Sequence, residues 1–107
     1  MLFGRHTPVL EVASGAPLLV DVEFGPVRRL FALSQGHFPP PPYPPAGAPA
    51  LPNTGSLVET DGDTGGFRVV ADGINLPSSL EIVGHTAYVV TLTGEVWRFR
   101  NITKSPW

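Results

Sequence analysis

The chain contains no cysteine, and it has a single lysine, a single glutamine and a single methionine. The absence of cysteine excludes disulfide bridges, thiolate-based zinc sites and thiol nucleophiles. Lys, Gln and Met, which favour helices, are scarce. The chain also has no window with apolar residues at i, i+3, i+4 and i+7 over three turns, as an amphipathic helix would have. The sequence therefore predicts very little helix.

Charge is also sparse, and the basic residues are scattered along the chain. Seven Lys and Arg against nine Asp and Glu give a formal net charge of −2, which excludes the broad basic surface that nucleic-acid binding requires. No apolar run reaches the roughly 20 residues that span a bilayer. The N-terminal residues lack the positively charged segment and the apolar segment that make up a secretory signal peptide. Neither a nucleic acid nor a membrane is expected as a partner.

Proline is concentrated in one stretch of the chain. Eight of the 13 prolines lie between Pro39 and Pro52. Fixed φ angles and missing N–H groups predict polyproline II structure there, without sheet pairing. We therefore expect one domain over residues 1–107 with a proline-rich loop insertion at residues 36–54.

The rest of the chain consists of short segments rich in Val, Leu, Phe, Tyr and Thr, separated by Gly, Pro, Asn and Asp. Such segments are typical of strands, and their short connections favour antiparallel neighbours. The sequence predicts an all-β fold with strands at Val9–Ala13, Leu19–Phe24, Arg29–Ser34, Ser56–Thr60, Phe67–Ala71, Ser79–Val83, Ala87–Thr91 and Glu95–Arg100.

An internal repeat organises these strands. Leu30–Ser34 matches Ala87–Thr91, and Gly55–Glu59 matches Gly94–Arg98. Two further pairs agree with these: Val12–Gly15 with Val70–Gly73, and Val22–Pro26 with Leu80–Gly84. Without the insertion the period is about 39 residues, close to that of a four-stranded propeller blade.

The repeat predicts two four-stranded antiparallel β-propeller blades in the permuted strand order d-abcd-abc. The strand at Val9–Ala13 would complete the blade formed by the C-terminal strands. Two blades cannot close a ring, since their outer faces need neighbouring sheets. The remaining blades would come from a longer chain or from identical copies, three of which form a trimer with six blades.

Strand direction places the insertion and the loop around Asn75 at the same end of the blades. Long insertions on a rigid scaffold often carry binding sites, so we expect a small-molecule or partner site there, including His37 and Asn75. Asp21, Glu23 and Glu81 lie on the innermost strands, where carboxylates suit a polar ligand or a divalent cation. Salt bridges to Arg28, Arg29 or Arg98 are the alternative role for these carboxylates. No cofactor and no catalytic residue is predicted.

Two further segments have competing interpretations. Phe38, Pro40, Pro41 and Tyr43 have the pattern of a proline-rich ligand for EVH1 or WW modules, whereas the alternative is a stiff strap with Phe38 and Tyr43 packed against the blades. Asp61–Gly66 resembles a calcium loop only superficially, because its spacing fails. Its Asp-Gly and Gly-Gly pairs instead predict a hairpin turn.

The ordered run of segments resembles the ScyD/ScyE family of NHL-like propellers. The likeness covers residues 8–100 and rests chiefly on Val20–Pro26, Leu30–Ser34, Pro52–Val58, Val69–Ile82 and Leu92–Arg98. The resemblance implies the C-terminal part of a six-bladed propeller and an exported, extracytoplasmic location. Some members of the family are linked to biosynthesis of the pigment scytonemin, and no catalytic residue can be carried over from it.

Three functions are compatible with these observations. The first is a propeller segment that serves as a ligand- or partner-binding scaffold without catalysis of its own. The second is a propeller enzyme, a hydrolase, lactonase or cyclising enzyme, with a carboxylate or cation site in its channel. The third is an interaction protein that uses the proline-rich tract.

Overall fold

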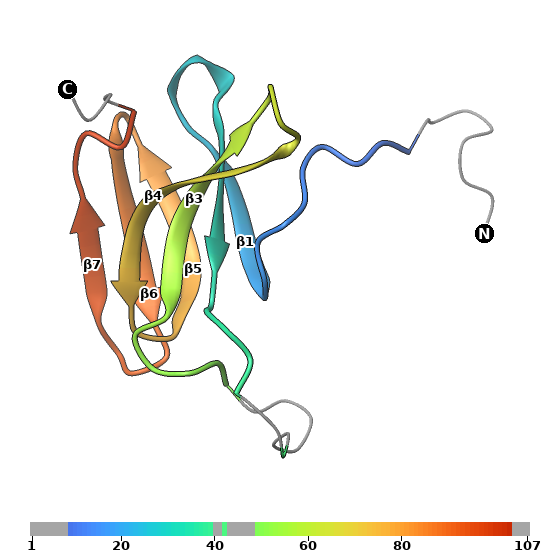
Figure 1. The fold of residues 1–107 in the computed structure, drawn as a ribbon. Helices are drawn as coiled ribbons and strands as arrows, with labels where there is room; N and C mark the ends of the chain where they lie inside the picture. The colour runs from blue at the N-terminus through green and yellow to red at the C-terminus, as the bar shows by residue number, and fades with distance from the viewer. Residues whose placement is uncertain (1–8, 40–41, 43–48, 104–107) are drawn as a thin grey trace.

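Two antiparallel sheets lie face to face in the computed structural model, which describes residues 9–39, 42 and 49–103 (Figure 1). Sheet A has the strand order β1-β2-β3-β4, and sheet B has the order β5-β6-β7. Their bounds are β1 (Leu19–Phe24), β2 (Leu30–Ser34), β3 (Gly55–Asp61), β4 (Gly66–Ile74), β5 (Pro77–Val83), β6 (Thr86–Thr91) and β7 (Val96–Phe99). The all-β prediction is confirmed.

Helix is almost absent from the described residues, as predicted. One short 3-10 helix, η1 (Pro26–Arg28), connects β1 to β2, with proline at its start. No helix among the described residues has the length and apolar character needed to cross a membrane.

The loops divide between the two ends of the sheets. The insertion end carries the β2–β3, β4–β5 and β6–β7 connections, and the hairpin end carries the other three (Figure 1). At the insertion end the Leu92 amide donates to the Leu76 carbonyl at 2.9 Å, and the Asn53 amide donates to Asn75 Oδ1 at 3.2 Å. The predicted grouping of these loops is confirmed.

Asp61–Gly66 at the hairpin end forms the turn between β3 and β4. The Gly65 amide donates to the Asp61 carbonyl at 2.9 Å, and the Asp61 carboxylate accepts from the Asp63 amide at 3.0 Å. Gly65 has φ of 73°, a conformation that glycine adopts without strain. The predicted hairpin turn is confirmed.

The core lies between the sheets, because alternate residues on each strand point into the same layer. Sheet A contributes Phe31, Leu33 and Leu57, each fully buried. Sheet B contributes Leu80, Ala87 and Val89, and Ile102 follows from the segment after β7.

The strand predicted at Val9–Ala13 does not form, and sheet B has three strands instead of four. The chain reaches β1 through Gly15, whose φ of 115° suits glycine. The Ser14 amide donates to the Gly65 carbonyl at 3.1 Å. Val12 and Ala13 lie against the face of sheet A that is turned away from sheet B. The segment therefore does not pair with β7, whose blade it was expected to complete.

Phe31 is fully buried in the layer between the sheets, so its truncation tests the packing. Phe31→Ala should lower the free energy of unfolding by about 3–5 kcal/mol, because the lost contacts leave a cavity. Val83→Ala, at a position that is 61% exposed, should lower it by less than about 0.5 kcal/mol. Urea denaturation measures both, and equal losses would contradict the assigned core.

Candidate functional site

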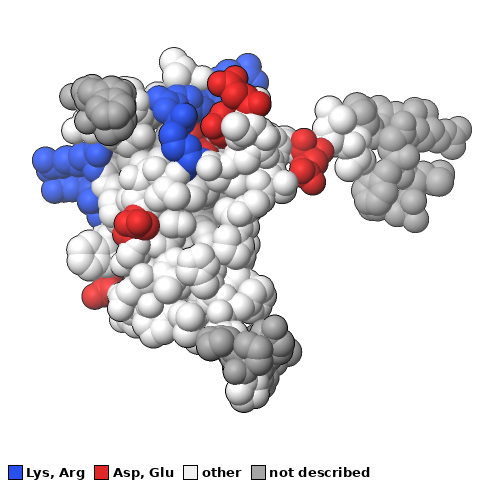
Figure 2. All heavy atoms as spheres, in the orientation of Figure 1, with Lys and Arg blue, Asp and Glu red and all other residues white. Residues whose placement is uncertain are grey.

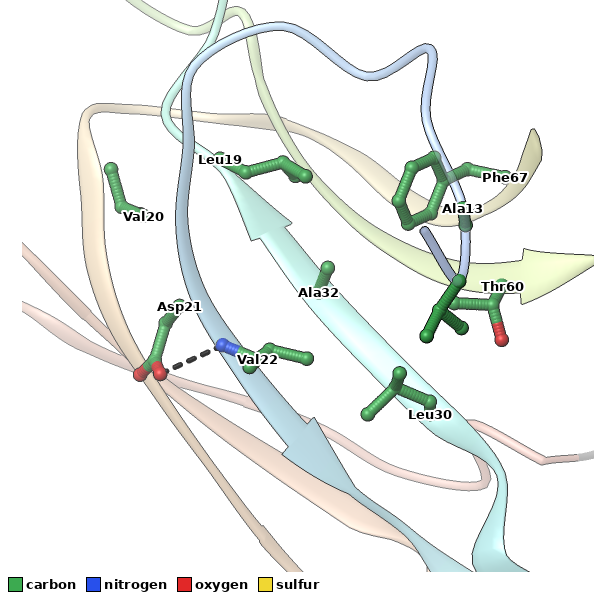
Figure 3. Close-up of a pocket in the computed structure, with 10 residues that line it drawn as sticks. Ala13, Leu19, Val20, Asp21, Val22, Leu30, Ala32, Thr60 and Phe67 are labelled. Atoms are coloured by element: carbon green, nitrogen blue, oxygen red, sulfur yellow. Dashed lines mark hydrogen bonds between the residues drawn. The ribbon is translucent and has the colours of Figure 1, made fainter. Parts of the chain in front are cut away.

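The outer face of sheet A, which is turned away from sheet B, carries an apolar pocket of about 500 Å³ (Figure 3). Strands β1 and β2 supply most of its wall, and the N-terminal segment crosses it at Val12 and Ala13. Across this face the cross-strand partners Val22, Ala32, Val58 and Val69 form one row. Val22 and Val69 at the two ends of the row are 53% and 60% exposed, whereas Ala32 and Val58 in its middle are 3% exposed. The sheet thus presents exposed apolar side chains at both edges of this face.

The outer face of sheet B is also open. Tyr88 and Val90 of β6 lie beside Val96 of β7 around a groove of about 570 Å³. The two predicted carboxylates Glu23 and Glu81 line the same groove. The structure therefore brings together these two of the five predicted ligand residues.

Asp21 serves to join the two sheets. Its Oδ2 accepts a hydrogen bond from the Leu80 amide at 2.8 Å, and its Oδ1 accepts one from the Val22 amide at 2.8 Å. Leu80 lies on β5, at the edge of sheet B that faces β1. Both carboxylate oxygens are therefore bonded to backbone amides of the chain itself.

Asp21, Glu23 and Glu81 form no ion pair among the described residues, so the alternative of salt bridges to Arg28, Arg29 or Arg98 is not realised there. Both ion pairs among the described residues involve Glu59 instead of Glu23 or Glu81. Within residues 9–39, 42 and 49–103, no group of three or more His, Asp or Glu side chains lies close enough to hold a metal ion. A divalent cation would find two carboxylates, Glu23 and Glu81, at this groove.

His37 and Asn75 lie at the insertion end but not in one pocket. His37 is exposed, and its amide donates to Thr54 Oγ1 at 3.0 Å. Asn75 lines a separate cavity of about 320 Å³ beside Trp97, and its side chain accepts from the Asn53 amide. The five predicted ligand residues thus do not converge on a single site.

The proline-rich tract is described only in part. Phe38 is 65% exposed, so this residue does not pack against the sheets as the strap interpretation requires. Pro40, Pro41 and Tyr43 lie outside the described residues. An exposed Phe38 is compatible with the predicted EVH1-type ligand motif.

An ion-pair cluster around the buried Glu59 carboxylate lies at the hairpin end. The Glu59 side chain is 5% exposed, and its Oε1 accepts from Arg29 Nη2 at 2.7 Å and from Arg68 Nη2 at 2.8 Å. Its Oε2 accepts from Arg29 Nε. The remaining Nη1 of Arg29 donates to the Thr103 carbonyl at 2.8 Å. One carboxylate thus fixes two guanidinium groups that are distant in sequence.

The ionisation of Glu59 follows from these contacts. Burial alone would raise the pKa of the Glu59 carboxyl, but hydrogen bonds and charge from Arg29 and Arg68 outweigh burial and lower that pKa. Glu59 is therefore a stable anion at neutral pH, and both arginines remain cationic.

The sequence analysis did not single out Glu59, and it assigned Arg29 to different carboxylates. One signal was present, because alternation along β3 places Glu59 on the same face as the core residue Leu57. A carboxylate at an inward position predicts a paired cation, since an unpaired buried charge is costly.

Comparisons with protein-family models, with curated proteins and with solved structures found no match to this chain.

Loss of the Glu59 charge should destabilise the protein. Glu59→Gln leaves two guanidinium groups without their counter-charge, and we expect a loss of about 3 kcal/mol in unfolding free energy. This loss is at the lower end of the range for breaking a buried ion pair, because the Arg29 and Arg68 side chains are 31% and 57% exposed. Urea denaturation at pH 7 measures the loss. Glu81→Gln, at an exposed carboxylate, is the control and should change stability by less than about 0.5 kcal/mol.

The same pair predicts a pH dependence with a definite sign. The pKa of Glu59 is lower in the folded protein than the value of about 4.3 expected in the unfolded chain. Its contribution is fully present above the unfolded-state pKa and disappears as the pH falls through the folded-state pKa. The stability difference between the native protein and Glu59→Gln should therefore shrink between pH 5 and pH 2. A difference that stayed constant over this range would contradict the assignment.

Proposed function

We propose that this chain is a non-catalytic binding scaffold of the β-propeller type. Sheets A and B act as neighbouring blades, and their outer faces bind further sheets of the same kind. One observation carries the proposal: Phe31, Leu33 and Leu80 are buried where the two sheets meet, whereas the repeat equivalent of each is exposed on the opposite face of the other sheet.

Strands β2 and β6 show this relation most clearly. Phe31 and Leu33 of β2 are both 0% exposed, whereas their repeat equivalents on β6, Tyr88 and Val90, are 37% and 40% exposed. The equivalent residues occupy corresponding positions in their sheets. They differ in that sheet B covers Phe31 and Leu33, while no described residue covers the outer face of sheet B to the same extent.

The reverse relation holds for β1 and β5. Leu80 of β5 faces sheet A and is 5% exposed, whereas its equivalent on β1, Val22, is 53% exposed on the outer face of sheet A. The outer face of sheet A thus corresponds to the covered face of sheet B. Two such surfaces can pack head to tail as sheets A and B do. Each apolar side chain that becomes fully covered contributes about 1.5–3 kcal/mol.

The free edge of sheet B supports the same proposal. β7 pairs with β6 on one side, and no described strand pairs with its other side. In sheet A the equivalent position is occupied by β4. An unpaired edge strand with exposed Val96 and Trp97 offers a template for a fourth strand.

The wider identity of the propeller rests on the sequence resemblance. Likeness to the ScyD/ScyE family supports six blades and an extracytoplasmic location. A ring of six blades then requires either further blades in a longer chain or three copies of this one. The insertion end, where the proline-rich loop lies, is the end at which we expect a small molecule or a protein partner to bind.

Self-association of the purified chain tests the proposal. In sedimentation velocity, the chain should associate at tens of micromolar, with closed trimers as the simplest product. Val22→Lys with Val69→Lys places two charges on the outer face of sheet A. Since burying unpaired charges is costly, the association constant should fall at least about a hundredfold.

Matched substitutions outside both faces provide the control. Val27 and Leu92 are exposed apolar residues in connections between strands, 86% and 57% exposed. Val27→Lys with Leu92→Lys should leave association unchanged. A native chain that stays a folded monomer at high concentration, or a control variant that dissociates as readily, would contradict the proposal.

A further inference from the structure

A second cavity, the basic groove, lies at the hairpin end between β4 and the segment that follows β7. It has a volume of about 870 Å³, and the residues that define it here are Arg29, Glu59, Arg68, Arg98, Arg100 and Ile102. Figure 2 shows that most of the Lys and Arg side chains on the visible face lie in the upper part of the molecule, while the lower part is largely uncharged.

The charge of the groove is opposite to that of the chain. Four of the seven basic residues of the sequence line it, against one carboxylate, that of Glu59. The lining therefore carries a formal charge of +3 (four positive, one negative) on a chain whose net charge is −2. Such a local excess attracts anions at short range.

Donor groups remain available in the groove. Arg68 uses one N–H group for Glu59, and its side chain is 57% exposed. A guanidinium has five N–H donors, so most of those of Arg68 are free among the described contacts. The side chains of Arg98 and Arg100 make no hydrogen bond or ion pair with any other described residue. Glu59 meanwhile holds Arg29 and Arg68 in place before a ligand arrives.

The rest of the lining is partly apolar. Ile102 is buried, and Val70 and Phe99 are partly buried against the same core. All three line the groove. A ligand that fits would therefore combine a negatively charged oxygen group with an apolar body.

We propose that the basic groove binds small organic anions in which a carboxylate or phosphate is attached to an apolar or aromatic body. The oxyanion receives charge-assisted hydrogen bonds from Arg68, Arg98 and Arg100, and the body lies against Val70, Phe99 and Ile102. The groove is at the end of the sheets opposite the proline-rich insertion. It is lined by residues of one chain, so the inference does not depend on assembly with further sheets.

Calorimetric titration of the purified chain tests this inference. The probes are phenyl phosphate, benzoate and the neutral benzamide, which keeps the aromatic body without the charge. Both anions should bind and benzamide should bind at least tenfold more weakly. Raising the salt concentration should weaken the binding of the anions and leave that of benzamide nearly unchanged. A stronger response to phenyl phosphate or to benzoate identifies which oxyanion the groove prefers.

Arginine variants locate the binding. Arg98→Gln and Arg100→Gln remove guanidinium groups that have no described partner, so neither should affect folding. Each should weaken binding of the preferred anion about tenfold. Arg28→Gln, an exposed arginine that does not line the groove, should change it less than twofold. NMR signals of the Arg68 side chain should shift on binding.

Several results would overturn the inference: no anion binding at millimolar concentration, equal affinity for benzamide, or affinity that survives both Arg98→Gln and Arg100→Gln. Self-association is measured separately by sedimentation. A failure of anion binding and a failure of assembly are therefore distinguishable.

Discussion

Face-to-face packing of β2 and β3 on β5 and β6 is the contact on which the rest of the structure depends. It buries Phe31, Leu33 and Leu57 against Leu80, Ala87 and Val89, and it covers one face of each sheet. Asp21 reinforces this contact by bonding across the gap to the amide of Leu80. Large apolar side chains also lie on the opposite face of each sheet. Several of these exposed positions are the repeat equivalents of positions that are covered in the other sheet.

Much of this architecture could be predicted from the sequence, because strand alternation and turn chemistry are local properties. Seven of the eight expected strands form close to their predicted bounds, and Asp61–Gly66 forms the expected hairpin. The exception, Val9–Ala13, is informative. Its match to Val70–Gly73 in the repeat predicts a position beside β7, but that edge of β7 stays unpaired among the described residues. Within the described chain, that segment lies against a sheet face and not beside an edge.

The charged sites were harder to predict. Glu59 and Arg29 are separated by 30 residues, and their pairing depends on the register of β2 on β3, which is fixed by packing and not by sequence spacing. The sequence alone does not show whether Arg29 pairs with Glu59 or with Glu23. Arg98 and Arg100 likewise join Arg68 in one groove only because sheet B folds onto sheet A. Their convergence gives the chain a basic site despite its negative net charge.

Hydrogen exchange at β7 tests the central claim most directly, since the free edge of this strand is where a fourth strand from another copy would pair. Backbone amides of Val96–Phe99 that do not bond to β6 should exchange rapidly at low protein concentration. They should become at least tenfold more protected as the chain associates, while the exposed connection at Gly84 stays unchanged as an internal reference. Protection that is the same at all concentrations, or that rises equally at Gly84, would contradict the proposal that the two sheets act as propeller blades and bind further copies.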